Sequence, residues 1–304
     1  MAIIETENLV RRFGRAEAVN GLDLTVPEGS VFALLGPNGA GKTTTIKVLM
    51  NLLAPSRGAA RILGVDSRRL GPDELRRIGY VSENQRLPLW MTVNDLIGYC
   101  RPLYPTWDRA LEASLLGQFE LPMGRPLKHL SRGGIMKAAL LVSLAYRPRL
   151  LVLDEPFSGL DPLVREDFVS GLLEASANGD WTIFVSSHDI EEVERLCDWI
   201  AVLEAGRLRF AESTETLLRR FRRVEAVGAA GSWPPQSSAD PSWIGWEETP
   251  GLARFIETAF SDNISLGRYH AAFPSAAVSV RPMTLREIFV AQARSDRARR
   301  KGGA

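Results

Sequence analysis

The stretch Gly36-Pro37-Asn38-Gly39-Ala40-Gly41-Lys42-Thr43 matches the phosphate-binding pattern G-x-x-x-x-G-K-[ST]. An apolar run precedes it at residues 31–35, and apolar residues at helical spacing follow from Thr44 to residue 53. This order predicts a strand, a glycine-rich loop and a helix N-terminus, where backbone N–H groups converge on an anion. In such a loop we expect Lys42 to contact the β- and γ-phosphates of a nucleotide and Thr43 to bind Mg²⁺.

Composition narrows the class of protein. With 304 residues, of which 45% are hydrophobic, the chain can form one large domain and a smaller one. Its net charge of +1 does not favour nucleic acid as the main partner. Cys100 and Cys197 lack a metal-like spacing and fit a reducing compartment. Neither a signal peptide nor an apolar run of spanning length is evident, so we expect a soluble, cytoplasmic protein.

A second candidate segment, which carries two carboxylates, lies in the middle of the chain. Residues 150–153 are fully apolar and end in Asp154 and Glu155. Adjacent carboxylates at a strand end repel each other unless a cation or a proton shares the site. Given the phosphate-binding pattern upstream, we expect Asp154 to hold Mg²⁺ and Glu155 to activate water, with helix capping as the alternative.

Three further positions are ambiguous on the residues alone. His188 follows the apolar run at residues 181–185, at the edge of a predicted parallel sheet where ligands bind. Phe13 could stack on an adenine ring or pack in the core. Ser131 begins a helix and could bind an anion, although a plain helix cap is favoured.

The order of these motifs resembles that of the ATP-binding subunit of ATP-binding cassette (ABC) transporters. The resemblance covers residues 1–215 and implies an α/β fold, a P-loop NTPase of the ABC ATPase type with an N-terminal β-layer and a helical insert at about 92–145. Residues 216–304 are expected to form a small C-terminal α/β accessory domain, similar to those of exporter-type subunits. Within it we predict a packed loop over 231–250, a short helix over 252–260, a strand over 277–280, a final helix capped at Thr284 and a frayed tail over 294–301.

In this family two subunits face each other head to tail and hold ATP and Mg²⁺ between them. The resemblance implies a general base, a γ-phosphate sensor and a phosphate-binding lysine, which are Glu155, His188 and Lys42. It implies Mg²⁺ ligands at Thr43, Glu83 and Asp154. It implies nucleotide contacts at Phe13, Gly36, Pro37, Asn38, Gly39, Ala40, Gly41, Lys42, Thr43 and Thr44, and contacts across the dimer at Ser131, Gly133 and Asp161.

Two departures from the family pattern stand out. The usual signature Leu-Ser-Gly-Gly-Gln is Leu-Ser-Arg-Gly-Gly here, and we expect Arg132 to point to solvent because a helix N-terminus disfavours a cation. Glu83 occupies the place of a Mg²⁺-contacting glutamine, with Gln85 a candidate only if the loop is shifted. A carboxylate can still ligate Mg²⁺ but adds negative charge, so we expect a steeper Mg²⁺ dependence.

The implied partners are a separate transmembrane permease and a second ABC ATPase subunit, identical or different, with no nucleic acid. The implied location is peripheral, on the cytoplasmic side of the cell membrane, and export is favoured over import. The alternative is a soluble ABC ATPase acting on ribosomes or nucleic acid, but such relatives usually carry two cassettes or a long coiled-coil insert. A small-molecule phosphoryl-transfer enzyme would leave Ser131 and His188 unexplained.

Overall fold

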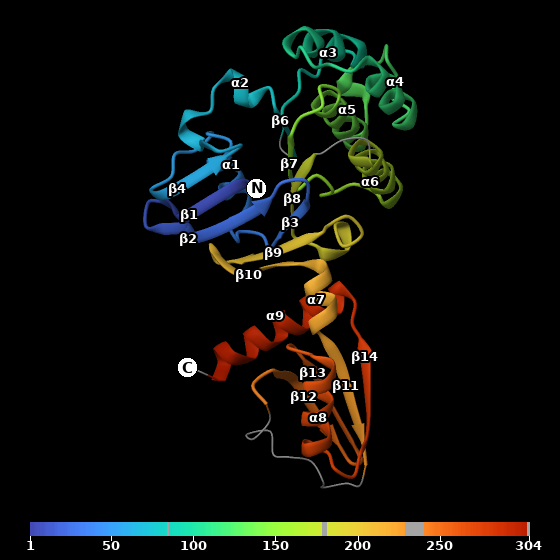
Figure 1. Cartoon of the computed structure of the whole chain (residues 1–304). Coiled ribbons are helices and arrows are strands. Elements are labelled where there is room, and N and C mark those ends of the chain that lie inside the picture. The colour runs from blue at the N-terminus through green and yellow to red at the C-terminus, as the bar shows by residue number, and fades with distance from the viewer. Residues whose placement is uncertain (84, 178–180, 229–239, 303–304) are drawn as a thin grey trace. The chain divides into compact units, whose positions relative to one another are not determined.

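The computed structural model describes residues 1–83, 85–177, 181–228 and 240–302 (Figure 1). The chain divides into two compact units, Met1–Ala211 and Glu212–Ala304. Within the described residues, no helix combines the length and the apolar character needed to cross a bilayer.

A six-stranded sheet forms the centre of the first unit, in the order β10-β9-β3-β8-β7-β6. Strand β3 pairs in parallel with β8 and β9, and β7 pairs in parallel with β6 and β8, so their carboxyl ends share one edge. The strands are β3 Val31–Leu35, β6 Ile78–Ser82, β7 Leu150–Asp154, β8 Thr182–Ser187, β9 Trp199–Glu204 and β10 Arg207–Ser213. The strands predicted at residues 31–35 and 150–153 are confirmed.

A second, antiparallel sheet provides the predicted N-terminal β-layer, in the order β2-β1-β4-β5. Its strands are β1 Ala2–Phe13, β2 Ala16–Pro27, β4 Arg57–Ile62 and β5 Val65–Asp66. One buried cluster joins both sheets to helix α1, Lys42–Leu49, with Leu22 from β2, Ile46 from α1 and Phe184 from β8 among its members. This shared core fixes the start of α1 against the edge of the parallel sheet.

Helices α3, α4 and α5 lie together and form the helical insert (Figure 1). Thr92 and Asp95 make reciprocal capping bonds at the start of α3, with Thr92 Oγ1 accepting from Asp95 N at 3.1 Å. The helices of the unit are α1, α2 Pro72–Leu75, α3 Val93–Cys100, α4 Arg109–Gln118, α5 Arg132–Leu144 and α6 Pro162–Ala177. Short 3₁₀ turns are η1 Ser67–Arg69, η2 Arg101–Leu103, η3 Leu127–His129 and η4 Ile190–Glu192.

The second unit contains an antiparallel sheet in the order β12-β13-β11-β14. Its core stacks Trp243 of β12 on Phe255 of β13, with ring centroids 4.4 Å apart, and adds Tyr269 of α8 and Phe273, which follows that helix. The elements are α7 Thr214–Arg220, β11 Arg222–Val227, β12 Trp243–Thr249, β13 Leu252–Glu257, α8 Asp262–Ala272, β14 Ala277–Pro282 and α9 Leu285–Gly302.

Three predictions for this unit were wrong. The segment predicted as a helix over 252–260 is strand β13, because its residues alternate between buried and exposed while they pair with both β11 and β12. Most of the described part of the predicted loop, residues 243–249, is strand β12, although Trp243 and Trp246 pack against the core as expected. Trp233 lies outside the described residues. The predicted frayed tail is helical, since α9 continues to Gly302. The strand β14 and the cap at Thr284 are confirmed.

Candidate nucleotide site

The phosphate loop, Gly36–Thr43, connects β3 to α1 and depends on its glycines. Gly41 has a φ of 106°, a left-handed value that favours glycine. A Cβ on Gly41 would stand 2.3 Å from the carbonyl oxygen of Ala18, and a Cβ on Gly36 would stand 2.2 Å from that of Leu203. The loop therefore needs glycine at both positions to pack this closely, and its backbone geometry fits a phosphate cradle.

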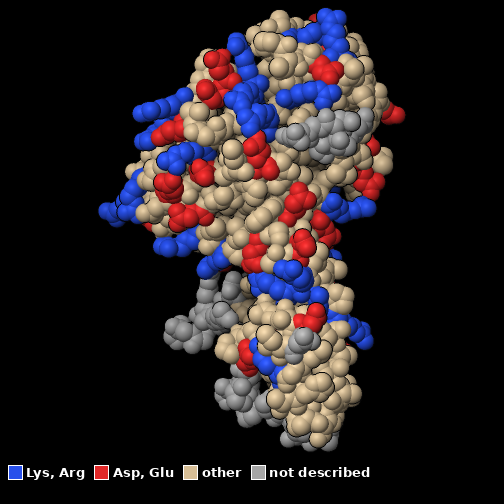
Figure 2. All heavy atoms as spheres, viewed as in Figure 1, with Lys and Arg blue, Asp and Glu red and all other residues tan. Residues whose placement is uncertain are grey.

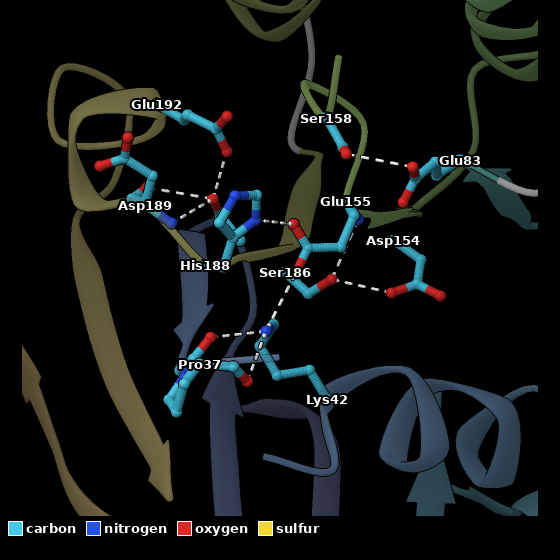
Figure 3. Close-up of polar contacts among 12 residues, drawn as sticks. Pro37, Lys42, Glu83, Asp154, Glu155, Ser158, Ser186, His188, Asp189 and Glu192 are labelled. Carbon is cyan, nitrogen blue, oxygen red and sulfur yellow. Dashed lines mark hydrogen bonds and ion pairs between the residues drawn. The ribbon is translucent and has the colours of Figure 1, made fainter. Parts of the chain in front are cut away.

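Lys42 lies within the phosphate loop rather than on the surface, at 5% exposure. Its Nζ donates to the carbonyl oxygen of Gly36 at 2.6 Å and to that of Pro37 at 3.3 Å (Figure 3). The same Nζ is 3.0 Å from Oε1 of Glu155. A buried ammonium needs such partners, and they hold it at the mouth of the loop.

Oxygen atoms gather at the ends of β7 and β8. Thr43 Oγ1 donates to Asp154 Oδ1 at 3.0 Å, and Ser186 Oγ donates to the same oxygen at 2.9 Å. Burial raises the pKa of Asp154, although the hydrogen bonds from Ser186 and Thr43 oppose that effect. The hydroxyl of Thr43 and the carboxylate of Asp154 form a hard oxygen donor set, which fits Mg²⁺.

The Glu155 carboxylate lies between two basic groups. Besides Lys42, it contacts His188, whose Nδ1 is 2.8 Å from Glu155 Oε2 (Figure 3). That hydrogen bond raises the pKa of His188 above its ordinary value. The backbone of Glu155 has a φ of 52°, and its N–H donates to Ser186 Oγ at 3.1 Å. The predicted base and sensor are therefore in direct contact.

Sequence reasoning missed the roles of two residues here. Ser186 is fully buried and bridges Asp154 and the backbone of Glu155. Glu192 of η4 is buried, accepts a hydrogen bond from Ser187 Oγ and lies near His188. The position of Ser186 at the carboxyl edge of β8 was a usable signal, whereas nothing in the local sequence pointed to Glu192.

The side chain of Arg132 is 48% exposed, in line with the expected solvent-facing position, but it also forms an ion pair that the sequence did not predict. Its Nη2 donates to Oε1 of Glu83 at 2.6 Å. Oε1 of Glu83 also accepts from Ser158 Oγ at 3.1 Å. The attraction of the nearby carboxylate outweighs the unfavourable helix dipole at this position. Gln85, the other candidate for the glutamine position, instead accepts from the backbone N–H of Ser82 at 3.4 Å.

The residues expected to reach across a dimer lie at helix ends. Ser131 caps α5, since its Oγ accepts from Gly134 N at 3.1 Å, and Asp161 Oδ1 accepts from Val164 N at 3.0 Å. Gly133 lies where a Cβ would be 2.6 Å from a methyl of Val164, so α5 and α6 pack closely there. In the described parts of the chain, no hydrogen bond or ion pair joins these residues to the phosphate loop of the same chain.

The remaining predicted nucleotide contacts are accessible. Phe13 is 47% exposed at the end of β1, so its interpretation as a core residue was wrong. The guanidinium carbon of Arg11 lies 4.6 Å from the centre of the Phe13 ring. Asn38 is exposed and Thr44 is half-buried in the first turn of α1.

Known proteins match the chain in both sequence and structure. Residues 19–158 match the ABC transporter family. The daunorubicin/doxorubicin resistance ATP-binding protein DrrA of Streptomyces peucetius is 38% identical, over 69% of this chain and 65% of its own length. Nod factor export ATP-binding protein I of Burkholderia orbicola is 37% identical, over 68% of this chain and 69% of its own. Import proteins also match, such as the sulfate/thiosulfate import ATP-binding protein CysA of Salmonella typhi, at 33% identity. The chain thus spans about two thirds of the length of these relatives.

A solved ATP-binding subunit of an ABC transporter superposes with a TM-score of 0.64 at 28% identity, covering 71% of this chain and 92% of that protein. This agreement confirms the predicted fold class of the first unit. Family and fold agree with the convergence of the phosphate loop, Asp154, Glu155 and His188 at one sheet edge. The chain belongs to the ABC transporter family, as one of its ATP-binding proteins.

Proposed function

We propose that this chain binds and hydrolyses ATP to drive a membrane transporter. The observation that carries the proposal is the placement of Lys42, Asp154, Glu155 and His188 within one hydrogen-bonded network at the carboxyl edge of the parallel sheet. This arrangement offers a cation for phosphate, an oxygen donor set for Mg²⁺ and a carboxylate beside the phosphate loop, which are the parts that phosphoryl transfer requires.

Each side chain has a distinct chemical role in the proposal. The backbone N–H groups of the phosphate loop and Lys42 bind and orient the β- and γ-phosphates, and Phe13 stacks on adenine. Thr43 and Asp154 would hold Mg²⁺, which would neutralise part of the charge on the phosphates. Glu155 accepts the proton of the attacking water, and protonated His188 donates a hydrogen bond to the γ-phosphate.

The site also requires a second ATP-binding subunit. Ser131 and Asp161 are exposed at the starts of α5 and α6, and Gly133 is buried in the first turn of α5; in the described parts of the chain, none of them bonds to the phosphate loop. We propose that they complete the nucleotide site of a partner subunit placed head to tail, whether that partner is identical or different. Closure on ATP and separation after hydrolysis would then move the attached membrane subunits.

A separate transmembrane permease is the proposed membrane partner. Large apolar side chains are exposed in the helical insert and just before it, where Trp90 is 73% exposed and Leu89, Tyr99 and Leu103 are also exposed. Docking there would place the chain at the cytoplasmic face of the membrane. Export is favoured by the resemblance of the C-terminal unit to those of exporter-type subunits, although relatives named for import also match.

The alternative, a soluble ABC ATPase acting on ribosomes or nucleic acid, gains no support from surface charge. Positive and negative side chains are interspersed over the face shown in Figure 2, with no continuous basic surface there. The chain's net charge of +1 agrees with this distribution.

Substitution of Glu155 by Gln tests the proposal. We expect Glu155→Gln to bind ATP but to lose turnover and to accumulate as an ATP-dependent dimer on size-exclusion chromatography. Glu248→Gln, an exposed change in the second unit, is the matched control and should behave like the wild type. Hydrolysis by Glu155→Gln near the wild-type rate would show that another base acts. Failure of any membrane protein to co-purify with the chain from detergent-solubilised membranes would argue against the permease partner.

A further inference from the structure

The two residues that depart from the family pattern, Glu83 and Arg132, contact each other. They are 49 residues apart in sequence, yet Arg132 Nη2 and Glu83 Oε1 are separated by only 2.6 Å. Glu83 follows β6, whereas Arg132 is the first residue of α5. The unusual carboxylate therefore has the unusual guanidinium as its counter-charge.

The surroundings of this ion pair hold both side chains in place. Ser158 Oγ donates to the same oxygen of Glu83 at 3.1 Å. The guanidinium lies against the backbone of Gly159, where a Cβ would stand 2.9 Å from Arg132 Nη1. The side chains of Glu83 and Arg132 are 30% and 48% exposed, and an isolated ion pair at such exposure has a small effect. The hydrogen bond from Ser158 and the contact with Gly159 restrict this ion pair more than an ordinary surface pair.

The pair also connects the catalytic sheet edge to the start of α5. The backbone N–H of Glu83 donates to the carbonyl oxygen of Asp154 at 3.0 Å, so Glu83 is anchored at the end of β7. Its side chain then reaches Arg132, the neighbour of Ser131. A chain of direct contacts thus runs from the proposed metal ligand Asp154 to the proposed partner-facing Ser131.

We infer that Glu83 and Arg132 act as one unit, a tie that positions the N-terminus of α5 relative to the catalytic sheet edge. Both are positioning residues, and Arg132 neutralises the extra negative charge that Glu83 brings near the phosphates. The inference rests on the proposed function in one respect, the role of Ser131 in a partner's site. It explains why the chain tolerates both departures together, since each charge compensates the other.

A double-mutant cycle tests the tie, with wild type, Glu83→Gln, Arg132→Ala and the double variant. We expect each single change to lower kcat at saturating ATP about threefold to fivefold, and the double variant to lose no more than about fivefold. Independent residues would instead give losses that multiply to about ninefold or more. Arg132→Lys should restore most of the rate because it keeps the charge. Arg125→Ala removes an exposed arginine of the helical insert and should leave the rate unchanged.

A second readout does not depend on ATP turnover. Because the ion pair joins two side chains of one chain, the same cycle should show coupling in the urea midpoint of the protein free of nucleotide and metal, and high salt should reduce that coupling. Additive effects on the midpoint or on kcat would overturn the inference. The inference would also be overturned if Glu83→Gln shifted the Mg²⁺ requirement equally in the wild-type and Arg132→Ala backgrounds. Glu83 would then act on the metal alone. If the wild type failed to dimerise on ATP, the proposed function would fail, while the urea cycle would still decide the tie.

Discussion

Ser186 contacts the carboxylate of Asp154 and the backbone of Glu155 at once, and its replacement should reduce both stability and turnover. Its hydroxyl donates to Asp154 Oδ1 at 2.9 Å and accepts from the backbone N–H of Glu155 at 3.1 Å, in a fully buried position. Ser186→Ala leaves the buried N–H of Glu155 without its hydrogen-bond acceptor, which costs about 1–3 kcal/mol. It also removes the hydrogen bond to the charged Asp154 carboxylate, which contributes about 1.5–3 kcal/mol. The two losses share one atom, so we expect a total of about 2–4 kcal/mol in the free energy of unfolding.

The same substitution should also slow turnover. Without the hydroxyl, the pKa of Asp154 rises further and the strained backbone of Glu155 loses its anchor. A displacement of about 1 Å at a reacting group can reduce rate roughly a hundredfold, so we expect kcat to fall roughly tenfold to a hundredfold. Urea unfolding and steady-state ATPase assays measure the two effects.

Ser143→Ala is the matched control, because Ser143 is also buried but makes only a long hydrogen bond, 3.4 Å, to Tyr80 O. It should change stability much less than Ser186→Ala. The reasoning is refuted if Ser186→Ala unfolds within about 0.5 kcal/mol of the wild type and retains its kcat, because so small an effect would mean that the hydroxyl supports neither Asp154 nor the backbone of Glu155.

Three further predictions follow from the site and its supports. The bond to Glu155 raises the pKa of His188, so the stabilising effect of the protonated imidazole is complete below about pH 6.5 and is lost as pH rises through the pKa of the folded state. His188→Gln should therefore destabilise the protein more at pH 6 than at pH 9 in urea titrations. An equal loss of stability at the two pH values would contradict this. Burial raises the pKa of Asp154, so the charge of its carboxylate disfavours the folded state at neutral pH. Asp154→Asn should therefore raise the urea midpoint at pH 7. The rise should be smaller near pH 3, where the carboxylate is more protonated, and ATP turnover should be lost at either pH. Gly133→Ala places a Cβ 2.6 Å from a valine methyl of α6 and should reduce the free energy of unfolding by about 1–3 kcal/mol. The control Gly98→Ala, at an open and exposed position of α3, should be neutral or stabilise the protein by up to about 1 kcal/mol. Equal effects of the two substitutions in thermal unfolding would argue against close packing of α5 on α6.

The second unit shows where local pattern was too weak to predict structure. Residues 252–257 alternate between buried and exposed in the folded protein, but a short apolar run is compatible with either a helix or a strand. Pairing with β11 and β12 decides the outcome, and β11 is separated from it by more than twenty residues. The capping box at Thr284 was predictable because all of its atoms lie within one helical turn.

The sequence by itself determined the phosphate loop, the strand that ends in Asp154 and Glu155, and the order of motifs that identifies the family. These features are encoded by contiguous residues, whose backbone requirements and hydrophobic patterns are local. Only the tertiary structure decided that Ser186 bridges the Asp154 carboxylate and the backbone of Glu155, that Glu155 lies between Lys42 and His188, and that Arg132 contacts Glu83. Those contacts join residues 31 to 113 positions apart. Because electrostatic attraction depends on distance, the partner of a charged side chain is decided only when the fold brings the two groups together.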